Sequence, residues 1–397
     1  MFEGVRVLEV SAWVMVPGAG VLLADLGADV IKVEHPVTAD PSRGLVTGGH
    51  SPSVGSVNMM TEQINRGKRS IGLDMSQPEG REILYQLASE CDIFLTSLLP
   101  AVRKKLAIDV DDIRAHNPDI IYAMADAVGS EGVEQGKPGF DSAVFFGRGG
   151  ILNSFATGDE LPTPRPGFGD KTAALSLAYG MAAALFHRER TGEPSVIETS
   201  LLGSAMWVAS SDIIYSQVVG KDFSTVERPA TNPLAHRYRT SDGRWIMLAM
   251  LASDRWWEEF AAAIGRSDLT ADERFSSART RAEHAEACIA ELATTFRGAP
   301  LEEWRRRLES FEGPWEPVQD SFEVGRDRQA VANGYIAEAP HPSGVTVHAV
   351  RTPVRRNGAA HDLGSAPEAW QHTEEILLEL GHDWDHIIDL KTKGVVP

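Results

Sequence analysis

The first 125 residues alternate between short β-rich runs and helical segments, and this alternation limits the possible folds more than any other feature of the sequence. The predicted strands cover residues 5–10, 28–34, 71–73, 92–96 and 120–125, and the predicted helices cover residues 21–26, 78–89 and 110–116. Strands that alternate with helices in this way predict a parallel sheet with helices on its faces. We therefore predict an α/β large domain whose ligands bind at the carboxyl ends of the strands.

The first strand, helix and second strand form a unit of the nucleotide-binding type. Glu34 ends the second strand, where an acidic residue that binds a ribose would stand. The loop after the first strand reads SAWVMVPGAG, however, and lacks the GxGxxG turn that holds a pyrophosphate. NAD binding is therefore kept only as a disfavoured alternative, and we predict no NAD requirement.

The chain has 397 residues, which is too many for one ordinary hydrophobic core. Its composition changes near Gly220, where a polar and irregular segment begins. A predicted strand pair around residues 241–243 and several helices follow it. We expect the large domain over residues 1–220 and a linker with a smaller domain over residues 221–330.

Charge and cysteine content exclude several classes of protein. The chain carries 56 acidic and 38 basic residues, for a formal net charge of −18, which argues against binding to nucleic acid or to an anionic membrane. We find neither an apolar run of 18 residues nor a secretory signal pattern. Cys91 and Cys288 form no CxxC pair, so neither a metal site nor a disulfide is predicted. We expect a cytoplasmic protein.

A loop rich in proline and glycine reaches an acidic residue, Asp170, and an apolar helix over residues 173–185 follows. An aspartate directly before a helix can accept hydrogen bonds from its first amides, and it lies in the positive field of the helix N-terminus. We expect an ionised carboxylate that faces the loop. Most aspartates at such positions are only helix caps, so the local pattern alone does not establish catalysis.

Two clusters of basic residues stand out on this acidic chain. One is NRGKRS, which ends in Arg69-Ser70, and the other is Arg103-Lys104-Lys105. Each could be a solvated turn or a contact to phosphate, because arginine and lysine are the usual partners of phosphate groups.

An ordered series of motifs resembles the class III CoA-transferases, the CaiB/BaiF family, over nearly the whole chain. The motifs are VRVLEVS, PGAGVLLADLGADVIKVEHP, NRGKRSIGLDMSQPEGREIL, NPDIIYA, PGFD, GFGDKTAALSLAYGMAAALFHRERTG, SLLGSAM and DGRWIMLAM. The series is specific for the family and much less specific for the substrate.

The resemblance implies that Asp170 is a nucleophile that carries CoA from an acyl-CoA donor to a carboxylic acid, through mixed-anhydride and aspartyl-CoA thioester intermediates. CoA would then enter only as part of the substrate, with no metal. The resemblance also implies an interlocked, ring-like homodimer in which residues 331–397 return to the large domain. Residues at the family's CoA-binding positions, or our candidates for such contacts, are Val14, His35, Arg69, Ser97, Lys105, Lys137, Phe140 and Asp141.

Some of these positions depart from the family pattern. Ser97 stands where transferases often have asparagine, and Lys105 stands where they have arginine. Val14 falls on or near the position of a glutamine in formyl-CoA transferase, which argues against formate and oxalate as substrates. The related acyl-CoA racemases have a histidine where this chain has Phe140, so a racemase or isomerase is the disfavoured alternative. A CoA-binding protein without catalysis is the other alternative.

The sequence names neither the donor nor the acceptor. Trp13, Val14 and Met15 lie in a predicted site loop and are compatible with a bulky apolar acyl group, but packing in the core explains them equally well.

Overall fold

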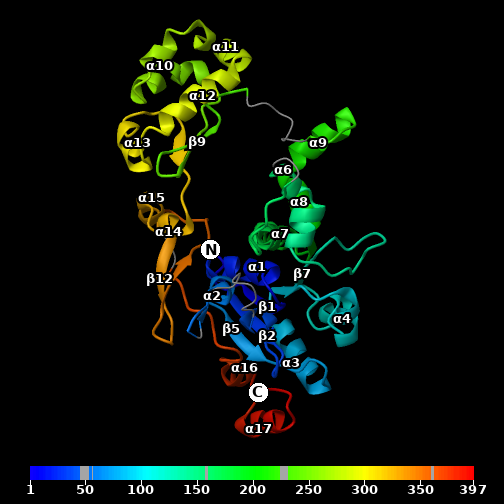
Figure 1. Cartoon of the computed structure of the whole chain (residues 1–397). Coiled ribbons are helices and arrows are strands. Elements are labelled where there is room, and N and C mark those ends of the chain that lie inside the picture. The colour runs from blue at the N-terminus through cyan, green and yellow to red at the C-terminus, as the bar shows by residue number, and fades with distance from the viewer. Residues whose placement is uncertain (45–52, 56, 157–159, 224–230, 359–361) are drawn as a thin grey trace. The chain divides into compact units, whose positions relative to one another are not determined.

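The computed structural model describes residues 1–44, 53–55, 57–156, 160–223, 231–358 and 362–397 (Figure 1). The chain divides into two compact units. Unit 1 comprises residues 1–226 and 331–397, and unit 2 comprises residues 227–330. The chain thus leaves unit 1, forms unit 2 and returns to unit 1.

A six-stranded parallel sheet is the centre of unit 1, in the order β5-β2-β1-β6-β7-β8. Its strands are β1 (Arg6–Val10), β2 (Asp29–Glu34), β5 (Arg69–Gly72), β6 (Ile93–Thr96), β7 (Ile121–Asp126) and β8 (Val196–Ser200). Strand β1 lies between β2 and β6. From β1 the next strands of the chain, β2 and β5, extend the sheet in one direction, and β6, β7 and β8 extend it in the other, so the strand order reverses between β1 and β6. In sheets of this kind, ligands bind outside the carboxyl ends at that reversal.

One face of the sheet is covered by helices from both parts of unit 1. These are α3 (Pro78–Ser89), α5 (Val110–Arg114), α16 (Thr373–Glu379) and α17 (Trp384–Thr392). Their buried side chains form one cluster with those of the strands. Leu8 and Phe94, which pair across β1 and β6, lie at the centre of this cluster. Residues after unit 2 therefore complete the core that the first 125 residues begin.

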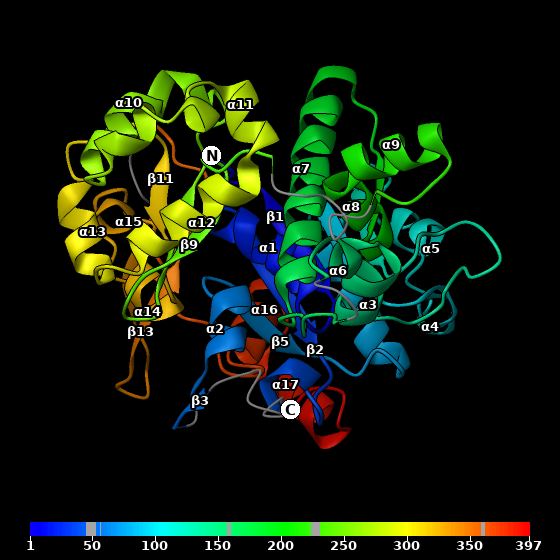
Figure 2. The same ribbon diagram turned by 45° about the horizontal axis from the view of Figure 1, so that its top comes forward.

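The opposite face is covered by α1 (Met15–Ala24) and α7 (Phe168–Thr191), which lie side by side in Figures 1 and 2. Small residues permit this close packing. A Cβ atom on Gly18 would lie 3.2 Å from the Cβ atom of Ala174 on the neighbouring helix. The N-termini of α1 and α7 thus lie at the same edge of the sheet.

The edge strand β5 is covered by the segment that leads into α16. The backbone N–H of Ser70 donates to Nδ1 of His372 at 3.1 Å, and that of Gly72 donates to Oγ1 of Thr373 at 3.0 Å. An edge strand otherwise presents unpaired N–H groups to other chains. Side chains from a distant part of the sequence therefore close this edge.

Unit 2 consists of a three-stranded antiparallel sheet packed against helices. Its elements are β9 (Arg237–Arg239), β10 (Trp245–Leu248), β11 (Trp315–Pro317), α10 (Ser253–Ala263), η4 (Ser267–Thr270), η5 (Glu273–Phe275), α11 (Ala278–Glu283), α12 (Ala285–Phe296), α13 (Leu301–Arg307) and α14 (Ser321–Val324). Aromatic residues fill its core, with Trp304 and Phe296 4.9 Å apart between ring centroids. Cys91 in unit 1 and Cys288 in unit 2 are both buried thiols.

The remaining elements are short or lie near the site. They are η1 (Pro41–Gly44), β3 (Ser53–Val54), β4 (Val57–Asn58), α2 (Met59–Asn65), α4 (Pro100–Leu106), η3 (Ser142–Arg148), α6 (Ile151–Ser154), α8 (Leu201–Val208), α9 (Ser210–Val219), α15 (Arg328–Ala332), β12 (Ile336–Pro340) and β13 (Thr346–Val350). No described helix combines the length and hydrophobicity needed to span a bilayer.

The predicted start of the first helix was wrong. Helix α1 begins at Met15 rather than at residue 21, and it accommodates Pro17 in its first turn, where no helical N–H partner is needed. The side chain of Asn58 caps the first amides of α2. Residues 201–219 form two helices, α8 and α9, which meet at Ala209.

Candidate active site

A cavity of about 280 Å³ opens at the carboxyl ends of β1, β6, β7 and β8, where the strand order reverses. This is the position at which a sheet of this topology binds ligands. The cavity is lined by Ala12, Trp13, Met15, Val16, Ser97, Leu98, Leu99, Val102, Ala125, Asp126, Ala127, Pro138, Gly139, Phe140, Asp170 and Leu201. Three of the predicted site residues, Asp170, Ser97 and Phe140, therefore share one cavity.

Asp170 lies in the first turn of α7, the helix that covers the sheet. The helix begins at Phe168, after Gly167, which has a φ of 87°. We predicted that the helix would begin after Asp170, but it begins at Phe168, two residues before Asp170. Asp170 is thus not the capping residue, and its carboxylate lines the cavity instead.

The capping carboxylate belongs to Asp141, which is almost fully buried. Its Oδ2 accepts hydrogen bonds from the backbone N–H of Gly167 at 2.7 Å and of Gly169 at 3.2 Å. A carboxylate at this place also lies in the favourable field of the helix N-terminus. Asp141, which we predicted as a CoA contact, therefore holds the start of α7. The backbone amides of Gly167 and Gly169 are therefore engaged by this carboxylate.

Gly169 is required by close packing rather than by a left-handed backbone. A Cβ atom at this position would lie 2.6 Å from the Phe145 ring, which is shorter than real contacts allow. Phe145 belongs to η3, the helix that follows Asp141. The glycine therefore lets the first turn of α7 lie directly against the segment whose aspartate caps it.

The electrostatic surroundings of Asp170 differ from our expectation of a carboxylate held in its ionised form. Burial, together with the negative charge of Asp141, raises the pKa of Asp170 to about 7, and Lys171 offsets this only in part. Burial also lowers the pKa of Lys171. Near neutral pH, Asp170 is therefore divided between its acid and carboxylate forms.

The wall opposite Asp170 is built from the loops after β1 and β6. Oγ of Ser97 accepts a hydrogen bond from the backbone N–H of Ala12 at 3.1 Å, which joins the two loops. Trp13 and Phe140 meet edge to face, with their ring centroids 5.2 Å apart. Val14 is buried beside them and precedes the first residue of α1.

The predicted phosphate contacts lie outside this cavity. The Arg69 guanidinium, at the amino end of β5, binds the carboxylates of Asp29 at 2.7 Å and Glu379 at 2.8 Å. That end of the sheet is opposite the cavity, so the structure gives no support to Arg69 as a CoA contact. Lys105 is exposed on α4, and Lys137 is exposed and paired with Glu134.

Two further residues bear on the nucleotide hypotheses. His35 is exposed directly after β2, at the carboxyl edge of the sheet. Glu34, the acid that a ribose would require, is buried and bound by Arg43 at 2.7 Å and by the hydroxyl of Ser70 at 2.6 Å. Its carboxylate is occupied by the protein, which further disfavours NAD binding at this position.

Sequence reasoning missed several lining residues that directly follow strands. Leu98 and Leu99 come after β6, and Asp126 ends β7 and accepts a hydrogen bond from the N–H of Gly129 at 2.5 Å. The rule that ligands bind at strand ends could have identified all three. The special backbone of Trp13, which has a φ of 70°, has no signal in the sequence.

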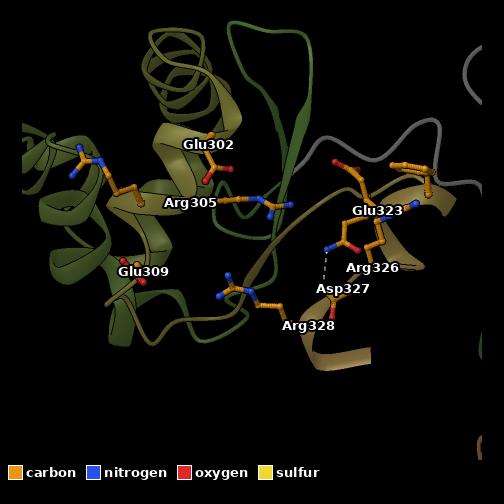
Figure 3. A pocket seen from close by; sticks show the side chains of 10 residues that line it. Glu302, Arg305, Glu309, Glu323, Arg326, Asp327 and Arg328 are labelled. Carbon is orange, nitrogen blue, oxygen red and sulfur yellow. Dashed lines mark hydrogen bonds between the residues drawn. The ribbon is translucent and has the colours of Figure 1, made fainter. Parts of the chain in front are cut away.

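A larger cavity, of about 660 Å³, lies in unit 2 between α13, α14 and the start of α15 (Figure 3). Its labelled side chains are charged: Glu302, Arg305, Glu309, Glu323, Arg326, Asp327 and Arg328. Over the described ranges of the chain, we find no group of three or more histidine, cysteine or acidic side chains placed to hold a metal ion.

The sequence profile of CoA-transferase family III matches residues 2–373. The (R)-2-hydroxy-4-methylpentanoate CoA-transferase of Clostridioides difficile is 33% identical to the chain over 398 residues, which cover 100% of this chain and 99% of that enzyme. The cinnamoyl-CoA:phenyllactate CoA-transferase of Clostridium sporogenes is 30% identical, over 98% of this chain and 96% of that enzyme.

The fold has a similarly extensive match. The crystal structure of a CAIB/BAIF family protein from Brucella suis aligns with a TM-score of 0.84 at 27% sequence identity. The alignment covers 96% of this chain and 99% of that protein.

Proposed function

This chain belongs to CoA-transferase family III, and we propose that Asp170 is the nucleophile through which it transfers CoA from an acyl-CoA to a carboxylic acid. One observation carries the proposal. Asp170 is held on the first turn of a helix that packs on the sheet, at the cavity where the strand order of the sheet reverses. A carboxylate fixed in this way can attack a thioester whose acyl carbon enters the cavity.

The reaction divides into four balanced steps. An Asp170 oxygen attacks the thioester carbonyl of the donor, and the carbon–sulfur bond breaks. CoA leaves as a thiolate, and the acyl group remains on Asp170 as a mixed anhydride. The thiolate then attacks the Asp170 carboxyl carbon and releases the donor acid, which leaves an aspartyl-CoA thioester. The acceptor carboxylate attacks this thioester and expels CoA thiolate again. The thiolate finally attacks the acyl carbon of the second anhydride, which yields the new acyl-CoA and restores the aspartate.

The raised pKa of Asp170 fits this role. A carboxyl group with a pKa of about 7 is partly ionised at neutral pH, and a strongly perturbed pKa in a cavity is typical of a functional group. Burial and the Asp141 charge are the physical causes. Asp141 thereby has two effects: it fixes the helix start, and it makes the neighbouring carboxylate more basic.

The lining of the cavity supports one path for CoA. Ser97, Leu98 and Val102 form an apolar side with one hydroxyl, which suits the pantetheine arm. The diphosphate and the 3′-phosphate need cations at the surface, and Lys105 and Lys137 remain our candidates for them, with His35 near the adenine. Substitution of either lysine by alanine is expected to raise the KM for acyl-CoA and to leave kcat nearly unchanged.

The acids exchanged are proposed to be monocarboxylic acids with a branched or aromatic side chain. The names of the two relatives point to 2-hydroxy-4-methylpentanoate and phenyllactate. No lysine or arginine lines the described cavity, so it offers no partner for a second carboxylate. An acceptor panel that contains both hydroxy acids and succinate tests this, and a preference for succinate would contradict it.

The homodimer expected from the family is also part of the proposal. The chain returns to unit 1 after unit 2, and such a path is compatible with a ring that a second copy threads. Light scattering of the purified protein is expected to give twice the chain mass, and a monomeric mass at all concentrations would exclude the arrangement.

Trapping the covalent intermediate tests the nucleophile directly. The protein is incubated with a panel of acyl-CoA donors, quenched with hydroxylamine or borohydride, and analysed by intact and peptide mass spectrometry. We expect a modified peptide that contains Asp170, and no modification in the Asp170→Asn variant. Asp126→Asn is the matched control, because Asp126 is the other carboxylate among the described lining residues. A label on another residue, or turnover by Asp170→Asn, would refute the assignment.

A further inference from the structure

Trp13 has a backbone conformation that a bulky side chain rarely adopts. Its φ is 70°, in the left-handed region that favours glycine, and it lies in the loop between β1 and α1 that lines the Asp170 cavity. Backbone strain of this kind persists only when the surrounding structure enforces it, and it concentrates at functional sites.

Three consecutive residues of this loop are each held by a side chain from elsewhere. The carbonyl oxygen of Ser11 accepts a hydrogen bond from Nζ of Lys32 at 3.0 Å. The N–H of Ala12 donates to Ser97, and the N–H of Trp13 donates to Oδ1 of Asp40 at 3.2 Å. These hydrogen bonds to side chains outside the loop therefore stabilise the backbone conformation of Trp13.

Lys32 and Asp40 belong to a fully buried group of charges. Nζ of Lys32 lies 2.9 Å from Asp40 and 3.1 Å from Glu9, and Nζ of Lys68 lies 2.7 Å from Glu9. Two positive and two negative charges balance one another, which a charge cluster in the protein interior requires.

The neighbouring helix is adapted to this cluster. A Cβ atom on Gly20 of α1 would lie 2.1 Å from a carboxylate oxygen of Glu9, so only glycine leaves room for that carboxylate. Nζ of Lys68 also donates to the carbonyl oxygen of Pro17, in the first turn of α1. The cluster thus fixes both the loop that carries Trp13 and the helix that follows it.

The strained conformation keeps the Trp13 indole at the cavity instead of in the core. Trp13 is 36% exposed and contacts Phe140, which is 57% exposed and also lines the cavity. Packing within the core does not explain an indole in this position. The two rings form an apolar cover beside Asp170.

We propose that Trp13 excludes water from the covalent Asp170 intermediates, and that Asp40, together with Lys32, is the positioning residue that holds Trp13 in place. This inference rests on the proposed function, because mixed anhydrides and the aspartyl-CoA thioester would hydrolyse if water reached them. Exclusion of water from reactive intermediates is a general role of closed active sites. Trp13 then decides how often an intermediate is transferred rather than hydrolysed.

The test measures the ratio of hydrolysis to transfer, with free CoA release and new acyl-CoA quantified in the same reaction. Trp13→Gly removes the indole while glycine retains the left-handed backbone, and Trp13→Phe keeps an aromatic ring. We expect Trp13→Gly to raise the ratio about tenfold, which corresponds to 1.4 kcal/mol, and Trp13→Phe to restore most of the difference. An unchanged ratio in Trp13→Gly would overturn the proposal.

Asp40 is tested by substitution in the wild-type protein and in the Trp13→Gly variant. Asp40→Ala should raise the ratio in the wild-type protein and add little in Trp13→Gly, since Asp40 acts through Trp13. Equal effects in the two backgrounds would overturn the positioning role. Asp40→Asn, which keeps an oxygen acceptor for the Trp13 N–H, is the conservative control and should leave the ratio close to the wild-type value. Asp40→Leu, which has no acceptor, replaces Asp40→Ala if that variant does not fold. Transfer by the wild-type protein is measured in every experiment, so a failure of the proposed function remains distinct from a failure of this inference.

Discussion

The cavity of about 660 Å³ in unit 2 and the cavity of about 280 Å³ beside Asp170 are built from different chemistry. Charged side chains of both signs line the larger cavity, and two of its carboxylates have partners in the structure. Glu323 is held by Arg244 at 2.6 Å, and Asp327 accepts a hydrogen bond from Gln319 at 3.0 Å. The smaller cavity brings together four strand ends, a helix start and a carboxyl group of raised pKa.

The comparison teaches that volume and side-chain chemistry point to different cavities in this protein. The carboxylates of Glu323 and Asp327 in the larger cavity already have partners within the protein, and ion pairs of this kind at a surface contribute little free energy. A carboxyl group whose neighbours leave it unsatisfied retains its reactivity. The following predictions test this contrast, from the largest expected effect to the smallest.

Asp170→Asn should cause the largest change. Removal of a covalent nucleophile is expected to lower CoA transfer more than about 1,000-fold, as for other nucleophiles in covalent catalysis. Binding of acyl-CoA should persist, because the rest of the cavity is unchanged. Steady-state transfer assays and calorimetric titration measure the two quantities. Activity within tenfold of the wild type would remove the distinction between the two cavities.

The pH dependence should show a limb near the pKa of Asp170, which is about 7. Only the ionised carboxylate attacks, so kcat/KM should fall about tenfold for each pH unit below that value. Asp141→Asn keeps an oxygen for the amides of Gly167 and Gly169 but removes a negative charge. The limb should therefore move to lower pH in this variant, and a shift to higher pH would contradict the cause that we assign.

Gly169→Ala tests the packing behind the nucleophile. The added methyl group would lie 2.6 Å from the Phe145 ring, so the helix start or the ring must move. Overpacking of this kind is expected to lower the free energy of unfolding by about 1–3 kcal/mol. Chemical denaturation measures this, and Gly192→Ala at the other end of α7 is a control for backbone strain without a steric clash. Wild-type stability and activity in Gly169→Ala would refute the close contact.

The stability of the protein should also depend on Asp170. Its folded-state pKa of about 7 lies above the ordinary value of 3.8, so the folded state binds this proton more tightly than the unfolded state does. The contribution of this group is therefore greatest below pH 4 and is lost as the pH rises to about 7. Asp170→Asn should be more stable than the wild type at pH 8 by about 2 kcal/mol, after allowance for partial exposure. If the difference in stability between Asp170→Asn and the wild type were the same at pH 5 as at pH 8, this result would argue against the raised pKa.

Arg305→Ala should have the smallest effect. Arg305 lines the larger cavity, and its loss is expected to change transfer less than twofold and stability by about 0.5 kcal/mol or less, which is usual for a surface substitution. The same transfer and denaturation assays measure this. A loss of activity comparable to that of Asp170→Asn would show that unit 2 contains part of the site.

The sequence allowed prediction of the parallel sheet, because its strands are short β-rich runs separated by helices of clear periodicity. It also allowed Asp170 to be singled out, since a glycine-rich loop, an acid and an apolar helix are adjacent in the chain. These sequence patterns involve residues that are close together in the chain, and such patterns predict local structure well.

The remaining features depend on contacts between distant residues. Asp141 caps a helix that begins 27 residues later, so the sequence pattern assigned the cap to Asp170 instead. Arg69 is bound by Glu379, 310 residues away, and so it could not be distinguished from a free phosphate ligand. The left-handed conformation of Trp13 is imposed by Lys32 and Asp40, and no local pattern encodes it.

The closure of strand β5 by His372 and Thr373 has a consequence for how the protein is made. A ribosome releases unit 2 before residues 370–373, so the small unit can fold while the edge of the large sheet is still open. The nascent large unit therefore carries a strand with one open edge until residues 370–373 have been made. Open strand edges favour aggregation, so we expect the chain to be prone to aggregation during that interval.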